Sequence, residues 1–301
     1  MTGPVLPGGL ALDGRAARRR FGRSGQDYDR YAVLQAEVRG ELLQRLALTT
    51  LAPAVVLDAG CGTGHASRAL QRRYPRARVI ALDFAPGMLR AARAQRSWLK
   101  PFDRVCADAQ QLPFADASID LIFSNLLVHW CDPGRLFGEL RRVLAPGGLL
   151  SFSCLGPDSL RELRSAWGQV DAAPHVHFFP DMHDVGDGLV RAGFAAPVLD
   201  VGHYTLQYRD LRALAADLRG SGSANALADR AKGLTGKGKF TRMVAAYETL
   251  RSAGRLPASV EVIFGQAWAP QSGAARGATE HAATGISLAA LRAKLPRNRR
   301  E

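Results

Sequence analysis

The sequence lacks several features that would assign it to a particular class of protein. It contains no run of about 18 or more uncharged apolar residues, the length that a membrane-spanning helix needs. In the first 20 residues the arginines come after a mildly apolar stretch, whereas a signal peptide carries its positive charge before the apolar region. Its four cysteines are scattered and form no Cys-x-x-Cys pair, which argues against disulfides and against a metal site. We therefore expect a cytoplasmic protein with no membrane partner and no metal ion.

Acidic residues are also few, with 27 Asp and Glu against 40 Lys and Arg, so the formal net charge is +13. Such a surface attracts polyanions, although an arginine-rich composition alone also produces basic proteins. Much of the excess lies at the two ends, which we interpret as a flexible basic arm over residues 1–26 and a disordered tail over 271–301. The basic runs lack neighbouring aromatic residues that would stack on bases, so we expect no nucleic-acid partner.

The apolar residues between these ends predict an α/β domain over residues 27–270. Short buried strands are expected at 54–58, 78–83, 103–106, 119–124 and 149–154, and helices at 28–48, 65–74, 86–95, 133–144 and 158–170. Strands that alternate with helices predict a parallel, doubly wound sheet. Segments 198–206 and 260–267 are expected to add a sixth strand and an antiparallel seventh. Helices at 210–219 and 240–253, with a loop over 220–239, then form a lid inserted at about 207–256.

A glycine loop follows the first expected strand, where doubly wound folds bind nucleotide-like ligands. Gly60, Gly62 and Gly64 let the backbone turn tightly and approach a ligand closely. The pyrophosphate fingerprint Gly-x-Gly-x-x-Gly fails because His65 takes its last position, and no Gly-Lys-Ser/Thr follows that would make a P-loop. Asp58 ends the strand and is suited to receive the ammonium group of a methionine moiety, while loop amides hold its carboxylate.

Two further acids follow the next two strands. Asp83 closes the second strand, where its carboxylate can accept both hydroxyls of a ribose, and Phe84 and Met88 beside it offer an apolar wall for an adenine ring. Asp108 and Ala109, after the third strand, are placed to contact the adenine amino group. Three acids at the carboxyl ends of three successive strands together predict a nucleoside-containing cofactor.

These segments resemble the motifs of the class I methyltransferases, namely residues 56–64, 82–89, 108–114 and 142–148. The resemblance covers residues 54–154 and implies a Rossmann-like, seven-stranded and mostly parallel sheet with a helical lid. It also implies S-adenosyl-L-methionine as the cofactor and adds Asn125, at the end of the fourth strand, to the expected cofactor contacts. The Asn/Asp-Pro-Pro-Tyr/Phe box of base N-methylating enzymes is missing, because Ser124 to Trp130 take its place.

The flanking segments are similar to the malonyl-acyl-carrier-protein O-methyltransferases of biotin biosynthesis. The similarity spans about residues 18–268 and includes residues 21–29, Gln35, 124–130, 159–163, 166–167, 170–171, 174–175 and 217–222. A related mitochondrial assembly factor, thought to hydroxylate an arginine, shares several of these segments. One departure is that Phe178-Phe179 stand where some members of the family have Arg-Phe after a histidine.

This resemblance implies methylation of the free carboxylate of malonyl-acyl-carrier protein by a monomeric enzyme. We expect Tyr28, His129 and Trp130 at the reacting groups, and Arg39, His175 and Arg219 at the substrate. The acidic carrier protein is expected to dock on Arg39 and on three lid lysines, Lys232, Lys237 and Lys239. Two alternatives within the same fold remain open: a methyltransferase for a small molecule or a quinone, and an assembly factor that binds the cofactor without methylating.

Overall fold

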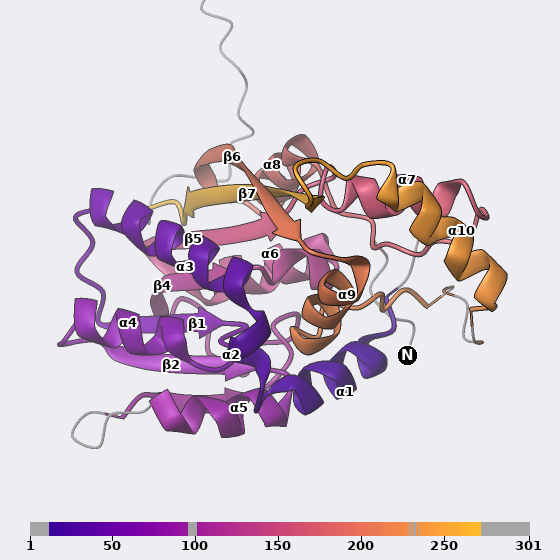
Figure 1. The fold of residues 1–301 in the computed structure, drawn as a ribbon. Helices are drawn as coiled ribbons and strands as arrows, with labels where there is room; N and C mark the ends of the chain where they lie inside the picture. Colours follow the sequence, from indigo (N-terminus) through magenta and orange to yellow (C-terminus); the bar gives the residue numbers. More distant parts are fainter. Residues whose placement is uncertain (1–11, 96–100, 229, 231–232, 234, 272–301) are drawn as a thin grey trace, which may run out of the picture. The chain divides into compact units, whose positions relative to one another are not determined.

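Seven strands form one sheet in the computed structural model, which describes residues 12–95, 101–228, 230, 233 and 235–271. The strands are β1 (Val55–Ala59), β2 (Arg78–Asp83), β3 (Asp103–Cys106), β4 (Ile119–Asn125), β5 (Leu144–Leu155), β6 (Ala195–Tyr208) and β7 (Leu256–Trp268). Their order across the sheet is β3-β2-β1-β4-β5-β7-β6 (Figure 1). The neighbours from β3 to β5 pair parallel, and β7 pairs antiparallel with both β5 and β6. The sheet predicted from the sequence, with its antiparallel seventh strand, is confirmed.

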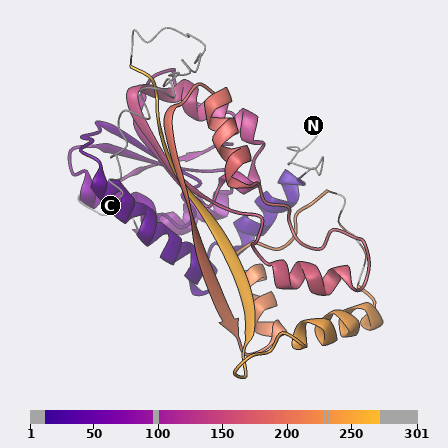
Figure 2. The same cartoon turned by 90° about the horizontal axis from the view of Figure 1, so that it is seen from above.

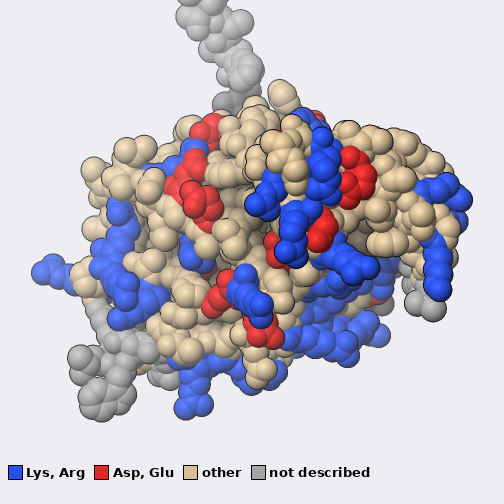
Figure 3. All heavy atoms as spheres, in the orientation of Figure 1, with Lys and Arg blue, Asp and Glu red and all other residues tan. Residues whose placement is uncertain are grey.

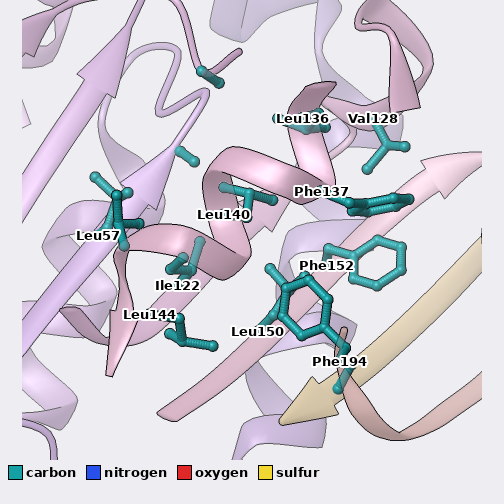
Figure 4. Close-up of a cluster of buried hydrophobic side chains, with 14 of the residues drawn as sticks. Leu57, Ile122, Val128, Leu136, Phe137, Leu140, Leu144, Leu150, Phe152 and Phe194 are labelled. Carbon is teal, nitrogen blue, oxygen red and sulfur yellow. The ribbon is translucent and has the colours of Figure 1, made fainter. Parts of the chain in front are cut away.

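Helices cover both faces of the sheet because successive strand residues point to opposite sides. Leu121 packs in one core cluster with α3 (Val33–Arg45), α4 (His65–Arg73) and α5 (Pro86–Ala92). Its neighbour Ile122 packs in the other cluster, with α6 (Pro133–Val143) and α8 (Met182–Arg191) (Figures 1 and 2). Figure 4 shows this second cluster, where the Phe137 and Phe152 rings meet at 5.8 Å between centroids.

The long strands β6 and β7 run past the end of the parallel sheet and carry a smaller core. In the sequence, α9 (Leu211–Gly220) and α10 (Lys237–Glu248) come between these two strands. Both helices pack with α7 (Arg161–Gly168) around buried Tyr247, Met243 and Leu214. Figure 2 shows these three helices beside the extended strands. The segment expected to form a lid therefore packs on extensions of the sheet.

The N-terminal half of the chain departs from the prediction at two places. The helix expected over 28–48 is divided into α2 (Tyr28–Tyr31), α3 and a 3-10 turn (Leu46–Leu48), because Ala32 leaves the helical conformation with φ −90° and ψ 42°. Part of the expected flexible arm is a helix, α1 (Gly14–Ser24), capped by the Asp13 side chain and packed on α5. The expected tail over 271–301 lies almost wholly outside the described residues.

The helices of the second half of the chain also differ from the sequence prediction. The helix expected over 158–170 is shorter, since Leu160 takes a left-handed conformation with φ 56° and α7 begins at the next residue. The helix expected over 240–253 is α10, which ends at Glu248, and α8 was not predicted. Within the described ranges, no helix has the length and apolar character to span a membrane.

Candidate active site

A cleft of about 1400 Å³ opens at the carboxyl ends of β1, β2 and β4. Its lining runs from the glycine loop, past the ends of these strands, to α1 and α9. Ligand pockets for small molecules usually measure about 300 to 1000 Å³. The cleft is therefore large enough for a cofactor and part of a second substrate together.

The glycine loop adopts the left-handed conformations that its sequence predicts. Gly60, Gly62 and Gly64 have φ values of 74°, 52° and 83°, and the Gly60 and Cys61 amides donate to the Leu82 carbonyl at 2.8 and 2.9 Å. A side chain at Gly62 would meet no atom within 4 Å, because this residue faces the cleft. The loop leads into the amino terminus of α4, whose free amides and dipole suit a carboxylate.

The two acids that end β1 and β2 are both buried. Asp58 accepts a hydrogen bond from the Ser67 hydroxyl at 2.5 Å, and burial raises its pKa to about 7. Asp83 accepts from the Gly62 amide at 3.0 Å and from the Ala85 amide at 2.8 Å, and burial raises its pKa to about 6. Asp83 thus ties the glycine loop to the second strand, and a cation that enters beside Asp58 would favour its charged form.

Arg39 lies deeper in the site than the sequence analysis placed it. It lines a small hollow with Tyr28, Asp58, Gly60 and the amino terminus of α4. Its guanidinium lies near the Asp29 and Asp58 carboxylates, and burial lowers its pKa. Arg39, expected at the substrate and the carrier protein, thus lies in a hollow beside Asp58 and the glycine loop.

The residues expected at the nucleoside line one side of the cleft. Phe84 and Met88 provide apolar surface, and Asp108, Ala109 and Asn125 line the same side. The Asp108 carboxylate accepts a hydrogen bond from the Gln110 amide at 2.9 Å, which closes a turn and fixes the Asp108 side chain beside the cleft. Asn125 is held by two hydrogen bonds, donating to the Gln35 carbonyl at 3.0 Å and accepting from the Ser153 hydroxyl at 2.9 Å.

Tyr28 is positioned by its neighbour Asp29, which the sequence analysis did not single out. One Asp29 oxygen accepts from the Thr63 hydroxyl at 2.6 Å, and the other lies 2.9 Å from the His65 Nε2 atom. These contacts hold α2 against the glycine loop, with Tyr28 lining both the hollow and the cleft. Burial and the nearby Asp83 and Asp29 raise the pKa of Tyr28 well above its usual value, so its hydroxyl stays protonated.

The other half of the cleft has an aromatic wall. The Trp130 ring meets the Phe21 ring at 5.1 Å and the His177 ring at 4.8 Å between centroids. The His129 ring meets Phe179 at 5.7 Å, and its Nδ1 atom accepts from the Leu155 amide at 3.3 Å. Burial, with His177 nearby, lowers the pKa of His129 to about 3, so this ring is neutral. The structure thus places His129 and Trp130 together, beside three rings that were not predicted.

His177 carries a polar atom that lacks a partner among the described residues. Its Nε2 atom accepts from the Ala226 amide at 2.9 Å, and burial lowers its pKa to about 4. The single proton of the neutral ring is therefore on Nδ1, which is buried and makes no hydrogen bond there. A buried donor without a partner is costly, and this one belongs to a residue that lines the cleft.

The remaining predicted substrate and docking residues that the structure describes are not among those that line the cleft. His175 stacks on Trp167 at 3.7 Å and its Nε2 atom lies 2.7 Å from Asp171, so it does not line the cleft, which argues against its predicted substrate role. Arg219 is exposed near the end of α9, beside the lining residue Leu218. Lys239 pairs with Asp171 at 2.8 Å, Lys237 begins α10, and Lys232 lies outside the described residues. The basic residues that do line the cleft outside the cofactor hollow are Arg15, Arg18 and Arg135.

The fold and the cleft define a methyltransferase that uses S-adenosyl-L-methionine. Residues 57–152 match the family described as "Methyltransferase domain". The chain is 52% identical over 268 residues to the malonyl-[acyl-carrier protein] O-methyltransferase of Methylovorus sp. strain MP688, covering 87% of this chain and 90% of that protein. It is 47% identical over 268 residues to the protein of the same name from Gallionella capsiferriformans, covering 87% and 92%.

Solved structures agree at the level of the fold. The YcgJ protein of Bacillus subtilis superposes with a TM-score of 0.56 at 18% identity, covering 76% of this chain and 98% of that one. Identity of this size shows the fold alone, whereas the two sequence relatives are similar over nearly their whole length. The chain belongs to the family of malonyl-[acyl-carrier protein] O-methyltransferases.

Proposed function

We propose that this protein transfers a methyl group from S-adenosyl-L-methionine to the free carboxylate of malonyl-acyl-carrier protein, the step that starts pimeloyl synthesis for biotin. The observation that carries the proposal is the continuity of one cleft, from the glycine loop to an aromatic wall with arginines at its rim. The high identity to relatives with that name supports the same acceptor.

The cofactor half of the cleft fits the cofactor through its donor set. Asp58 and the amides at the start of α4 suit the ammonium and carboxylate of the methionine moiety, and Arg39 adds a positive charge for the carboxylate. Asp83 suits the ribose hydroxyls, and Phe84 and Met88 suit the adenine ring. The residues that we propose for the cofactor are Asp58, Gly60, Gly62, Gly64, Asp83, Phe84, Met88, Asp108, Ala109 and Asn125, together with Arg39.

The chemistry needs no general base. A malonyl carboxylate is ionised at neutral pH, because carboxylic acids of this kind have a pKa of about 3 to 4. When bound, S-adenosyl-L-methionine would supply the methyl group: the bond between a carboxylate oxygen and the methyl carbon forms while the bond between that carbon and the sulfonium sulfur breaks. The protein then has to orient the carboxylate and exclude water.

Neutral donors suit this task better than cations, because a tight ion pair would lower the reactivity of the carboxylate. The Tyr28 hydroxyl stays protonated beside the glycine loop, and the His177 Nδ1–H is an unpaired donor in the acceptor half. We assign the Tyr28 hydroxyl as a hydrogen-bond donor to the malonyl carboxylate, and the His177 Nδ1–H as a donor to the carbonyl oxygen of the thioester. His129 and Trp130 form the wall that keeps water out.

The test is methyl transfer from labelled S-adenosyl-L-methionine to malonyl-acyl-carrier protein, malonyl-CoA, acetyl-acyl-carrier protein and a small phenolic acid. Label on the malonyl-carrier product and none on the acetyl-carrier protein is expected. Equal label on malonyl-CoA would contradict the requirement for the carrier. Label on the phenolic acid alone would favour a small-molecule enzyme, and no label on any acceptor with intact cofactor binding would reject methylation of malonyl-acyl-carrier protein.

A further inference from the structure

Four arginines share the outer face of α1. Arg15 is three residues from Arg18 and four from Arg19, and Arg19 is four residues from Arg23. These spacings place the group Arg15, Arg18, Arg19 and Arg23 on one side of a helix. All four are exposed, whereas Ala16 and Ala17 on the other side are buried. None of the four forms a salt bridge with any residue in the described part of the chain. We call this group the α1 basic face, and Figure 3 shows basic side chains gathered where Figure 1 places α1.

The α1 helix is fixed at the mouth of the cleft. Arg20, on its inner side, donates to the Ala224 carbonyl at 2.7 Å and to the Asn225 carbonyl at 2.5 Å. Phe21 packs against Trp130 in the aromatic wall. On the α5 side the backbones touch so closely that a Cβ atom on Gly87 would lie 2.0 Å from the Gly22 carbonyl oxygen. These contacts fix the position of α1, so the α1 basic face is part of the folded domain and does not belong to a flexible arm.

Two members of this face also border the ligand space. Arg15 and Arg18 line the cleft, and neither of them lines the hollow that contains Arg39 and Asp58. Four like charges on less than three turns of helix repel one another, so this arrangement is stabilised when an anionic surface lies against it. A malonyl group that is attached to a carrier protein enters the cleft with its tether, while the carrier protein itself stays at the mouth of the cleft.

We propose that the α1 basic face is the docking surface for the acidic face of the acyl carrier protein, with Arg15 and Arg18 beside the entry of the malonyl arm. This inference rests on the proposed function. It replaces the sequence-based expectation of docking on Arg39 and the lid lysines, because Arg39 lies inside the cofactor hollow and Lys239 is paired with Asp171.

The test is equilibrium binding of fluorescently labelled carrier protein, measured by anisotropy at several salt concentrations. The variant Arg15→Glu/Arg18→Glu reverses two charges at exposed positions. The matched control is Arg72→Glu/Arg76→Glu, the same charge change at exposed positions. These residues precede the amino-terminal end of β2, whereas the cleft lies at the carboxyl ends of the strands. We expect Kd to rise at least tenfold, with a shallower salt dependence, for the α1 variant, and less than twofold for the control.

The affinity for S-adenosyl-L-methionine, measured on both variants, reports whether each has folded and should equal that of the wild type. Wild-type affinity of the α1 variant for the carrier would overturn the proposal, as would equal weakening by the control pair. Tighter binding of a single-stranded RNA than of the carrier would also overturn it. Because binding is read without methyl transfer, an intact docking surface with no methylated product would count against the proposed function and not against this surface.

Discussion

The two halves of the cleft are built in different ways. The cofactor half comes mainly from residues that directly follow β1, β2 and β4, so neighbours in sequence are neighbours in space. The acceptor half brings together α1, the Val128–Trp130 turn, residues 177–179 and the segment 221–228, which are far apart along the chain. A local arrangement can be recognised from a short motif, whereas a distant one depends on how whole segments pack. We therefore expect changes in the first half to affect mainly cofactor binding, and changes in the second half to affect mainly the acceptor.

The largest effect is expected from Asp83→Ala in the cofactor half. The substitution removes the carboxylate that fixes the Gly62 and Ala85 amides and that we assign to the ribose. We expect calorimetry to show at least a hundredfold weaker binding of S-adenosyl-L-methionine, or about 2.7 kcal/mol. Asp103→Ala is the control, since Asp103 forms only an exposed pair with Arg78 on the same sheet. A loss of less than threefold would remove Asp83 from the cofactor site.

The next largest effect is expected when α1 is displaced, which should weaken acceptor use more than cofactor binding. Gly87→Ala places a Cβ atom 2.0 Å from the Gly22 carbonyl oxygen, so α1 must move away from α5. Alanine normally stabilises a helix over glycine by about 0.5 to 1 kcal/mol, so a lower Tm would show the clash. We expect kcat/KM for malonyl-acyl-carrier protein to fall about thirtyfold, with a smaller change in cofactor affinity. Gly22→Ala should behave as wild type, because its Cβ would meet no atom within 4 Å.

A smaller effect is expected from His177→Phe, which keeps the ring but removes the unpaired Nδ1–H donor. We expect KM for the malonyl acceptor to rise about tenfold while the Kd for S-adenosyl-L-methionine is unchanged. His177→Asn keeps one donor and one acceptor and should recover part of the loss. An equal loss of cofactor affinity in His177→Phe would show that this residue supports the fold and does not contact the acceptor.

An effect of about the same size is expected in the pH dependence of cofactor binding. Asp58 has a pKa of about 7 because it is buried; Asp83 nearby raises this pKa further, while the Ser67 hydrogen bonds and Arg39 lower it. Below pH 7 the empty site is thus mostly neutral at Asp58, and a bound ammonium group drives its proton off. Affinity should rise about tenfold from pH 5.5 to 7, where the cofactor amino group is still charged. Calorimetry in two buffers should detect the released proton. The variant Asp58→Asn should bind weakly and keep only the smaller pH dependence that comes from Asp83, whose pKa of about 6 lies in the same range.

The same division explains how far the sequence could predict the molecule. The end of β1 was found because a buried strand followed by a glycine loop is a local signal, and the end of β2 because an acid closes a second buried strand. The helix α1 was missed because it buries only two alanines and depends on the close approach of Gly22 to Gly87. His175 was chosen over His177 because nothing in an irregular segment tells which of two nearby histidines faces the cleft. Such contacts exist only after distant segments have packed.

The central claim is that the methyl group goes to a carboxylate oxygen of the carrier-bound malonyl group. A carboxyl methyl ester is cleaved by mild alkali, which releases the label as volatile methanol, whereas methyl ethers and methylamines keep it. We therefore expect the product formed from labelled S-adenosyl-L-methionine and malonyl-acyl-carrier protein to lose its label as methanol in alkali. Label that stays on the protein or on a small molecule after this treatment would contradict carboxyl methylation.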